Sequence, residues 1–306
     1  MDRISIPIDA SKEPAYLNLG CGRNFHSSWV NVDLGPIHAD VIEHDITDGI
    51  PFDNDSFDAV YHSHVLEHLN PDQGKTLIRE CNRVLKPGGV LRVVVPDLER
   101  IAILYLEMLD EAWQGNRNSR INYDWMKLEL LDQMVRDQSG GRMGPYMADS
   151  EIENSRFVME RLGDEFLVCQ NQNRDIKTSS TQSKWALFAN SFSRLKLRMA
   201  FRVVRWLLGR KAEKAFREGL FRSQGEIHRW MYDRYSLKDI CESAGFDEFK
   251  VCYADESRID SFTSFDLDTV SGKVRKPDSL FVECVKGVAA EIVASQGATT
   301  IESRSA

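Results

Sequence analysis

The sequence predicts an α/β fold with a doubly wound, mostly parallel sheet of about seven strands and a helical insertion after the fifth strand. Short apolar strands alternate with helical segments from residue 15 to residue 98. The alternation then stops, and it resumes near residue 226. Apolar strands separated by helices are typical of a parallel sheet that is covered on both faces.

Five strands are expected in the N-terminal part, where short apolar runs lie at residues 15–19, 29–33, 40–45, 57–63 and 89–96. A helix is expected over residues 71–85, and the Lys-Pro-Gly-Gly sequence at 86–89 ends it.

From residue 99 to residue 225 the pattern is helical, with the clearest segments at 101–113, 123–137 and 184–221. A helix over 236–244, capped by Ser236 and ended by Gly245, then leads into strands at 249–253 and 279–285. We therefore expect one domain from residues 1–98 and 226–288, a substrate-covering helical insertion over 99–225, and a disordered tail over 289–306.

Composition and charge narrow the class of protein. The net charge of −8 gives no general attraction to nucleic acid, so no nucleic-acid partner is expected. The chain shows no signal-peptide pattern and no apolar run of about 18 residues, which a membrane-spanning helix needs. Its six cysteines lack C-x-x-C spacing. We expect a cytoplasmic protein with reduced thiols.

The turn Gly20-Cys21-Gly22 follows the first strand, and the second strand ends in Asp33. In a doubly wound sheet this arrangement brings bare backbone and a ribose-binding carboxylate into one crevice. The third glycine of a dinucleotide fingerprint is missing, because Gly22 is followed by Arg, Asn and Phe. The sequence therefore predicts a site for a ligand that contains a nucleoside and is not a dinucleotide.

Several short blocks follow in a characteristic order. They are Leu17–Gly22, Asn31–Leu34, Asp45-Ile46, Ile50–Phe52, Ser56–Asp58, His64–His68 and Arg83–Gly89. Together they resemble class I S-adenosylmethionine-dependent methyltransferases, in particular the broad type 11 group that includes ubiquinone-type and sugar methyltransferases. The resemblance covers residues 15–98 well and 226–286 loosely, and it leaves out the insertion. It implies a Rossmann-like fold, methyl transfer and S-adenosylmethionine as the cofactor.

The resemblance also implies which residues bind the cofactor. The glycine turn would approach the methionine part, Asp33 the ribose hydroxyls, and Asp45 the adenine amino group. Asn18 stands where the family often has an acid, and it can still bind the ammonium group. The expected cofactor-binding residues are Asn18, Gly20, Cys21, Gly22, Asp33, Leu34, Asp45, Ile46 and Ser63.

Three histidines, His62, His64 and His68, lie around the end of the fourth expected strand. A hydroxyl acceptor needs a base to take up its proton, and histidine is suited to this role near neutral pH. We expect His64, after the fourth strand, and His228, in a polar and aromatic cluster, to be the catalytic residues. His64 and His68 are four residues apart and could share a helix face, as a base or as metal ligands. We favour a bracing role for His68, a core position for His62, and no metal site. Asp97 is expected to cap the next helix.

Residues 184–222 carry eleven Lys and Arg against two Glu. Arg194, Arg198, Arg202 and Arg205 recur at helical spacing beside an apolar stripe of Leu197, Phe201, Val204 and Leu208. Such a helix fits peripheral contact with an anionic inner-membrane surface through 194–222, which would suit a lipid-linked acceptor. The favoured alternative is that the apolar face of this helix packs on the rest of the protein. A weaker alternative is that the basic residues bind a phosphate or a nucleic acid.

The predicted function is O-methylation of a saccharide or lipid-linked saccharide in cell-surface polysaccharide biosynthesis. Oxygen is preferred because histidines surround the site and the Asn/Asp-Pro-Pro-Tyr motif of amino-group methylation is missing. One alternative is a quinone-type small-molecule methyltransferase. Another is a non-catalytic S-adenosylmethionine-binding protein that acts through its basic insertion.

Overall fold

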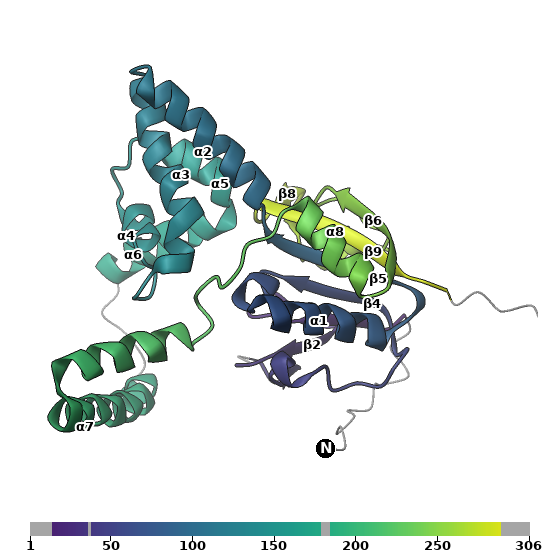
Figure 1. Ribbon diagram of the computed structural model, residues 1–306, viewed down its shortest axis with the longest axis horizontal. Helices are drawn as coiled ribbons and strands as arrows, with labels where there is room; N and C mark the ends of the chain where they lie inside the picture. Colours follow the sequence, from purple (N-terminus) through teal and green to yellow (C-terminus); the bar gives the residue numbers. More distant parts are fainter. Residues whose placement is uncertain (1–13, 36–37, 179–183, 289–306) are drawn as a thin grey trace, which may run out of the picture.

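The computed structural model describes residues 14–35, 38–178 and 184–288. A seven-stranded sheet has the order β3-β2-β1-β4-β5-β9-β6 (Figure 1). Strands β1 to β5 pair in parallel, and β9 runs antiparallel to both β5 and β6. The strands are β1 (Tyr16–Leu19), β2 (Val30–Asp33), β3 (Val41–Glu43), β4 (Phe57–Ser63), β5 (Leu85–Pro96), β6 (Phe246–Cys252) and β9 (Ser279–Lys286). The predicted doubly wound, mostly parallel fold is confirmed.

Two helices cover one face of the sheet, α1 (Pro71–Val84) and α8 (Arg234–Ser243) (Figure 1). Helix α1 begins with a capping box, in which the Asn70 side chain accepts from Gln73 N and the Gln73 side chain binds back to Asn70 N. Apolar side chains of both helices and of alternate strand positions form the larger core cluster. The other face packs against the segment between β6 and β9, where Phe262 of the short 3-10 helix η3 (Phe262–Phe265) and Leu267 cluster with Trp29 and Tyr61.

Several elements differ from the sequence prediction, among them β6, which begins at Phe246 rather than at residue 249. Strand β5 begins at Leu85, not at residue 89, because Leu85 pairs with Phe57 and the ladder continues past an irregularity before Ala59. Helix α8 is capped by Asp233, whose carboxylate accepts from Ser236 N at 2.8 Å, so Ser236 is not the cap. The short hairpin of β7 (Thr269–Val270) and β8 (Lys273–Val274) was not predicted, because two-residue strands have no readable period.

The segment between β5 and α8 is helical, as predicted. Helices α2 to α6 have a core of their own around Trp125 and Met126, and they project from one end of the sheet (Figure 1). Asp97 caps α2 by accepting from Arg100 N at 3.0 Å, as expected. The helices are α2 (Leu98–Trp113), α3 (Arg117–Val135), α4 (Met143–Ala148), α5 (Ser155–Leu162), α6 (Asp164–Thr178) and α7 (Lys184–Arg222).

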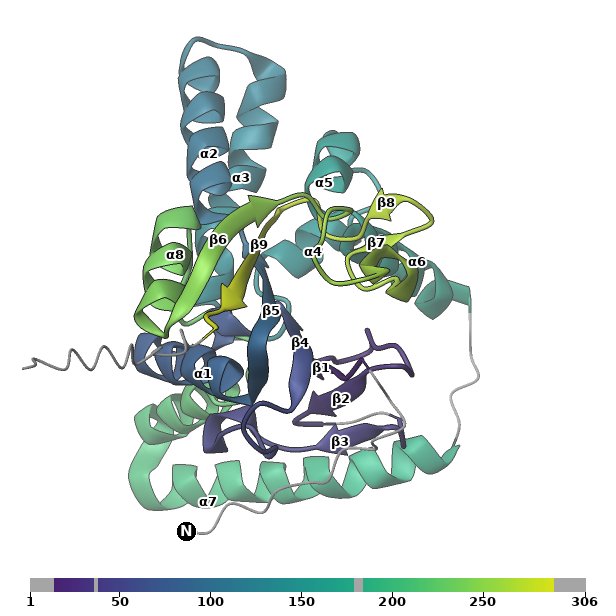
Figure 2. The same cartoon turned by 90° about the vertical axis from the view of Figure 1, so that its right-hand side faces the viewer.

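Helix α7 is not one continuous helix, because Gly209 has non-helical dihedrals with a φ of 85° (Figure 2). Phe201, on the predicted apolar stripe, is buried: its ring lies 5.7 Å from that of Phe216, and the Arg217 guanidinium lies 3.7 Å from its centroid. The two halves of α7 therefore pack on each other. The side chain of Arg194 and the expected disordered tail, 289–306, lie outside the described residues.

None of the six cysteines, all of which lie in the described residues, is paired in a disulfide. Within the described part of the chain, no helix is long and apolar enough to cross a membrane.

Candidate functional site

The glycine turn after β1 presents bare backbone to a cavity. Gly20 has a φ of +62°, and a Cβ atom on it would lie 2.4 Å from Val65 Cγ2. Gly22 has a φ of +54°, and a Cβ atom there would meet nothing within 4 Å. Both positions therefore favour glycine for its backbone conformation, and Gly20 also for the close approach of Val65.

The carboxylate of Asp33 is held at the end of β2 by two backbone amides. Gly22 N donates to Oδ2 at 2.8 Å, and Gly35 N donates to Oδ1 at 2.9 Å. A carboxylate oxygen can accept more than one hydrogen bond, so both oxygens keep capacity for the hydroxyls of a ligand.

A cavity of about 600 Å³, which we call the adenosine cavity, lies beside Asp33. The expected cofactor residues in its lining are Gly20, Asp33, Leu34, Asp45 and Ile46. Asp45 is partly engaged, because its Oδ1 accepts from Thr47 N at 2.9 Å and from Thr47 Oγ1 at 2.7 Å. Residues 223–225 and Arg229 also line this cavity. No sequence signal pointed to residues 223–225, which end the insertion and carry no motif, whereas Arg229 belongs to the polar cluster around His228.

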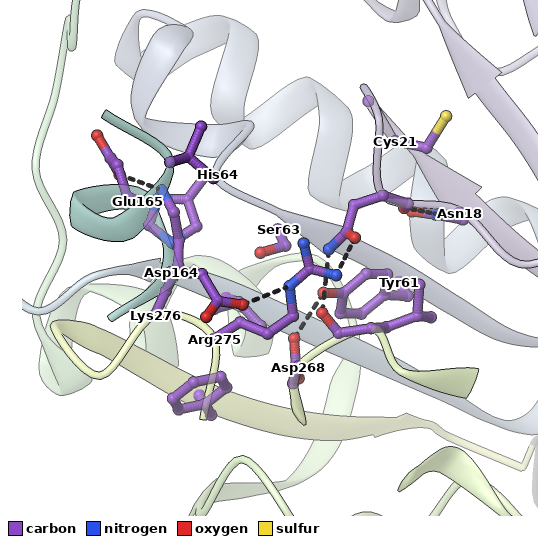
Figure 3. A pocket seen from close by; sticks show the side chains of 16 residues that line it. Asn18, Cys21, Tyr61, Ser63, His64, Asp164, Glu165, Asp268, Arg275 and Lys276 are labelled. Atoms are coloured by element: carbon purple, nitrogen blue, oxygen red, sulfur yellow. Dashed lines mark hydrogen bonds and ion pairs between the residues drawn. The ribbon is translucent and has the colours of Figure 1, made fainter. Parts of the chain in front are cut away.

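A second cavity of about 310 Å³, the methionine cavity, is lined by Asn18, Gly20, Cys21, Ser63 and His64 (Figure 3). Asn18 Nδ2 donates to Asn24 O and to Asn31 Oδ1, each at 3.1 Å, which leaves Oδ1 of Asn18 as an acceptor. Burial and then the Asp33 charge raise the pKa of the Cys21 thiol to about 11, so Cys21 is a poor nucleophile at neutral pH.

Charged residues form the opposite wall of the methionine cavity (Figure 3). From the insertion come Asp164 and Glu165, and Glu165 Oε2 lies 3.1 Å from Lys276 Nζ. Asp268 accepts from Tyr61 Oη at 2.6 Å. This wall has no signal in the sequence, because its members are far apart in the chain and share no pattern.

His64 lies where the cavities meet. It is at the end of β4 with a φ of 54°, and it lines both cavities already described and a third one of about 500 Å³. Its Nε2 is 2.9 Å from Ser279 Oγ, and its Nδ1 is 3.1 Å from Glu67 Oε1. The prediction that His64 and His68 share a helix face is wrong, because only a short 3-10 turn, η2 (Leu66–His68), follows the strand.

The third cavity, which we call the histidine cavity, is also lined by Glu67, His68 and His228. His228 is only 4% exposed, so it is a buried residue and does not lie in a surface turn. Its ring lies 4.9 Å from that of His68 in an edge-on arrangement, and burial lowers its pKa to about 3. Burial opposes ionisation of Glu67, but the surrounding imidazoles outweigh it and hold the pKa of Glu67 at about 2.

Residues 17–93, which include β1, β2, β4 and most of the cavity-lining residues of the N-terminal part, match the family model of a methyltransferase domain. Residues 17–93 therefore belong to a methyltransferase domain, and the fold around them is that of a class I S-adenosylmethionine-dependent methyltransferase of the type 11 group. Its cofactor is S-adenosylmethionine, and as a methyltransferase it acts on an acceptor molecule.

Solved structures similar to the methyltransferase include three with broad coverage. A putative methyltransferase from Haloferax volcanii, solved with a methyltransferase activator, is 12% identical over 90% of this chain and 83% of that chain, with a TM-score of 0.35. A possible histamine N-methyltransferase from Thermotoga maritima has 13% identity, the same coverages and a TM-score of 0.36. A methyltransferase from Archaeoglobus fulgidus has 12% identity, coverages of 90% and 87%, and a TM-score of 0.35. No curated protein matches the chain.

The adenosine and methionine cavities share Gly20 and His64, so they adjoin each other at the glycine turn. Gly22 lines neither cavity, and its amide holds Asp33, which lines the adenosine cavity.

His62 belongs to the core of the methyltransferase, as expected. It is fully buried in β4, and neither ring nitrogen has a hydrogen-bond partner. Burial lowers its pKa to about 4, so His62 is neutral at pH 7.

Proposed function

We propose that the methyltransferase transfers a methyl group to a hydroxyl of a saccharide or lipid-linked saccharide in cell-surface polysaccharide biosynthesis. The observation that carries this proposal is the position of His64, which lines the two cofactor-sized cavities and the polar histidine cavity. A group placed there can reach both the cofactor and an acceptor.

In this proposal Asp33 accepts hydrogen bonds from both ribose hydroxyls, and Asp45 binds the adenine amino group. Leu34 and Ile46 contribute contacts with the adenosine, and Ile46 also contributes its amide. The methionine part lies over Gly20, Cys21 and Gly22, with Asn18 Oδ1 accepting from the ammonium group and Ser63 near the methyl donor. The contacts around Asp33 and Asn18 support these roles, because each residue keeps acceptor capacity after its internal hydrogen bonds.

S-adenosylmethionine supplies an electrophilic methyl group, so that the carbon–oxygen bond to the acceptor forms as the carbon–sulfur bond breaks. The protein has to align the acceptor and receive its proton. His64 is the residue we assign to the proton, since its ring lines all three cavities and Glu67 Oε1 lies beside its Nδ1. His228 is the second catalytic candidate, and its depressed pKa makes it the weaker base.

The insertion over 99–225 covers the acceptor in this proposal. Asp164, Glu165 and Val168 of α6 line the methionine cavity, and Gln133, Arg136 and Met143 line the histidine cavity. Carboxylates and cations on these walls suit an acceptor rich in hydroxyls better than an apolar quinone ring. Residues 1–98 and 226–288 form the cofactor-binding domain in this proposal.

Labelled-methyl transfer from S-adenosylmethionine into fractionated cell extract tests the acceptor class. Label is expected in the glycan or lipid-linked glycan fraction. Label in a quinone fraction, or consumption of no methyl group with any fraction, would overturn the proposal.

Matched variants test the assigned roles. His64→Ala should lose turnover and keep cofactor binding, whereas Asp33→Asn should weaken cofactor binding by at least about 10-fold, because charge-assisted hydrogen bonds are lost. His38→Ala is the control, since His38 is exposed and lines none of the three cavities. Turnover by His64→Ala at the wild-type rate would refute the role of His64.

We also propose that the protein is cytoplasmic and contacts the inner membrane peripherally through 194–222. In the described part of α7, exposed apolar side chains lie at positions i, i+4, i+7 and i+8, which is one helix face. They are Met199, Val203, Trp206 and Leu207, and exposed Arg198, Arg202 and Arg205 lie on the same helix.

Co-sedimentation with vesicles tests this contact. The wild-type protein should sediment with phosphatidylglycerol vesicles and not with phosphatidylcholine vesicles, because the attraction is electrostatic. The Arg198/Arg202/Arg205 triple alanine variant should remain in the supernatant. Wild-type protein that stays in the supernatant with both vesicles would refute the membrane contact.

A further inference from the structure

The carboxylate of Glu67 is buried without a hydrogen bond. Its side chain is fully buried, and neither Oε1 nor Oε2 has a hydrogen-bond partner. The one basic group at ion-pair distance is His64 Nδ1, 3.1 Å from Oε1, among the residues that the structure describes. A fully buried carboxylate whose one close partner is an imidazole is costly to desolvate, so this position favours a cation.

Two imidazoles face the same carboxylate. Ligand atoms of Glu67, His68 and His228 all lie within 4.8 Å of one another, and this is the one such group of three found in the described chain. His68 Nδ1 lies 3.2 Å from Ile227 O, a carbonyl that can only accept, so Nδ1 carries the proton and Nε2 keeps its lone pair. His228 Nδ1 is buried and has no hydrogen-bond partner.

The backbone holds this group together across a long sequence separation. Arg229 N and Trp230 N both donate to Glu67 O, at 2.7 and 3.2 Å, and His228 N donates to Gln133 O at 3.1 Å. These bonds place the strand-end segment of Glu67 against the segment that follows the insertion. The three side chains are therefore brought together by the fold, and not by a local motif.

We propose that Glu67, His68 and His228 bind one divalent transition-metal ion. Two imidazoles and one carboxylate are a ligand set that proteins use for Zn²⁺ with an open coordination position. A small closing movement of the side chains would bring the three ligand atoms to metal-binding distance, and the ion would neutralise the buried carboxylate. This proposal replaces our expectation of no metal site.

The open position would face the histidine cavity, whose lining also includes Asp278, a buried acid with an Oδ1 that has no hydrogen-bond partner. If the proposed hydroxyl methylation is correct, on which this step rests, the ion binds the acceptor hydroxyl and lowers its pKa. His64, next to Glu67, then receives the proton. The metal site itself does not depend on the identity of the acceptor.

Calorimetric titration of the full-length, chelator-stripped protein with Zn²⁺, without cofactor or acceptor, tests the site. One ion per chain should bind with a dissociation constant in the micromolar range or tighter. Glu67→Gln and His228→Ala should each weaken binding by at least about 100-fold, since each removes a ligand. His38→Ala should bind Zn²⁺ like the wild type, and cofactor binding by each variant shows that it is folded.

Equal Zn²⁺ affinity in wild type, Glu67→Gln and His228→Ala would overturn the proposal, and so would no Zn²⁺ binding by the wild type. If Glu67→Gln and His228→Ala fail to fold, a variant of the half-buried ligand His68 is used instead. Wild type should then gain thermal stability with Zn²⁺, and His68→Ala should not; an equal gain in both refutes the site. Zn²⁺ binding without any methyl transfer would refute the proposed function and leave the metal site standing.

Discussion

Replacing His62 with leucine should make the fold less sensitive to acid, by an amount that the depressed pKa of His62 fixes. His62 is fully buried in β4 with two unpartnered ring nitrogens, and burial lowers its pKa from 6.5 to about 4. The folded protein therefore keeps this ring neutral where the unfolded chain would bind a proton. Leucine has a similar volume and no titrating group, so the substitution should be tolerated at pH 7.

The sign and size of the effect follow from proton linkage. Because the pKa is lower in the folded state, stability is fully present above pH 6.5 and is lost as the pH falls toward about 4. Each pKa unit corresponds to about 1.4 kcal/mol, so His62 accounts for about 3 kcal/mol of lost unfolding free energy. Glu67, His68 and His228 are present in both the wild type and the variant. Their own contribution to acid sensitivity is therefore common to both proteins and cancels in the comparison.

Urea unfolding at several pH values between 7 and 4, in chelator-containing buffer, measures this difference. The wild type should lose about 3 kcal/mol more than His62→Leu over this interval. Val60→Ala, at a fully buried neighbouring position, is the control: it should lower stability by about 2 kcal/mol at every pH and leave the slope unchanged. Parallel pH curves for wild type and His62→Leu would refute the assignment of His62 as a neutral core residue.

Two further predictions concern the cofactor turn and a buried ion-pair network. Gly20→Ala should weaken cofactor binding by at least about 10-fold, because of its positive φ and the overlap with Val65, and Val65→Ala added to it should restore part of the affinity measured by calorimetry. Arg92→Met should lower the unfolding free energy by about 3–5 kcal/mol, since it leaves Asp268 and Glu283 buried without their cation; thermal unfolding close to wild type would contradict this.

The order of strands and the cofactor turn could be predicted because their signals are local. A buried strand is readable as an apolar run, and a glycine turn followed by a strand-end acid is readable within about 20 residues. The boundary error at Leu85 has a tertiary origin, because pairing with Phe57 extends β5 through a Pro-Gly-Gly segment. The error at Ser236 is local, because the capping box of Asp233 and Ser236 starts α8 at Arg234.

The acceptor side could be predicted only in part. His64 and His228 were found as candidates from residue type, but their contacts were not readable, because His228 meets Glu67 and His68 across more than half the chain. The charged wall of Asp164, Glu165 and Lys276 had no signal at all, since its members come from the insertion and from the segment before β9.

The sequence by itself determined the fold class and the methyl donor, because strand periodicity and the motif-bearing turns depend on neighbours along the chain. Only the tertiary structure decided what surrounds His64. The buried carboxylate of Glu67, the imidazoles of His68 and His228 and the kink at Gly209 depend on how distant segments pack and hydrogen-bond. Burial and unmet hydrogen bonds are properties of that packing, so they appear only in the folded protein.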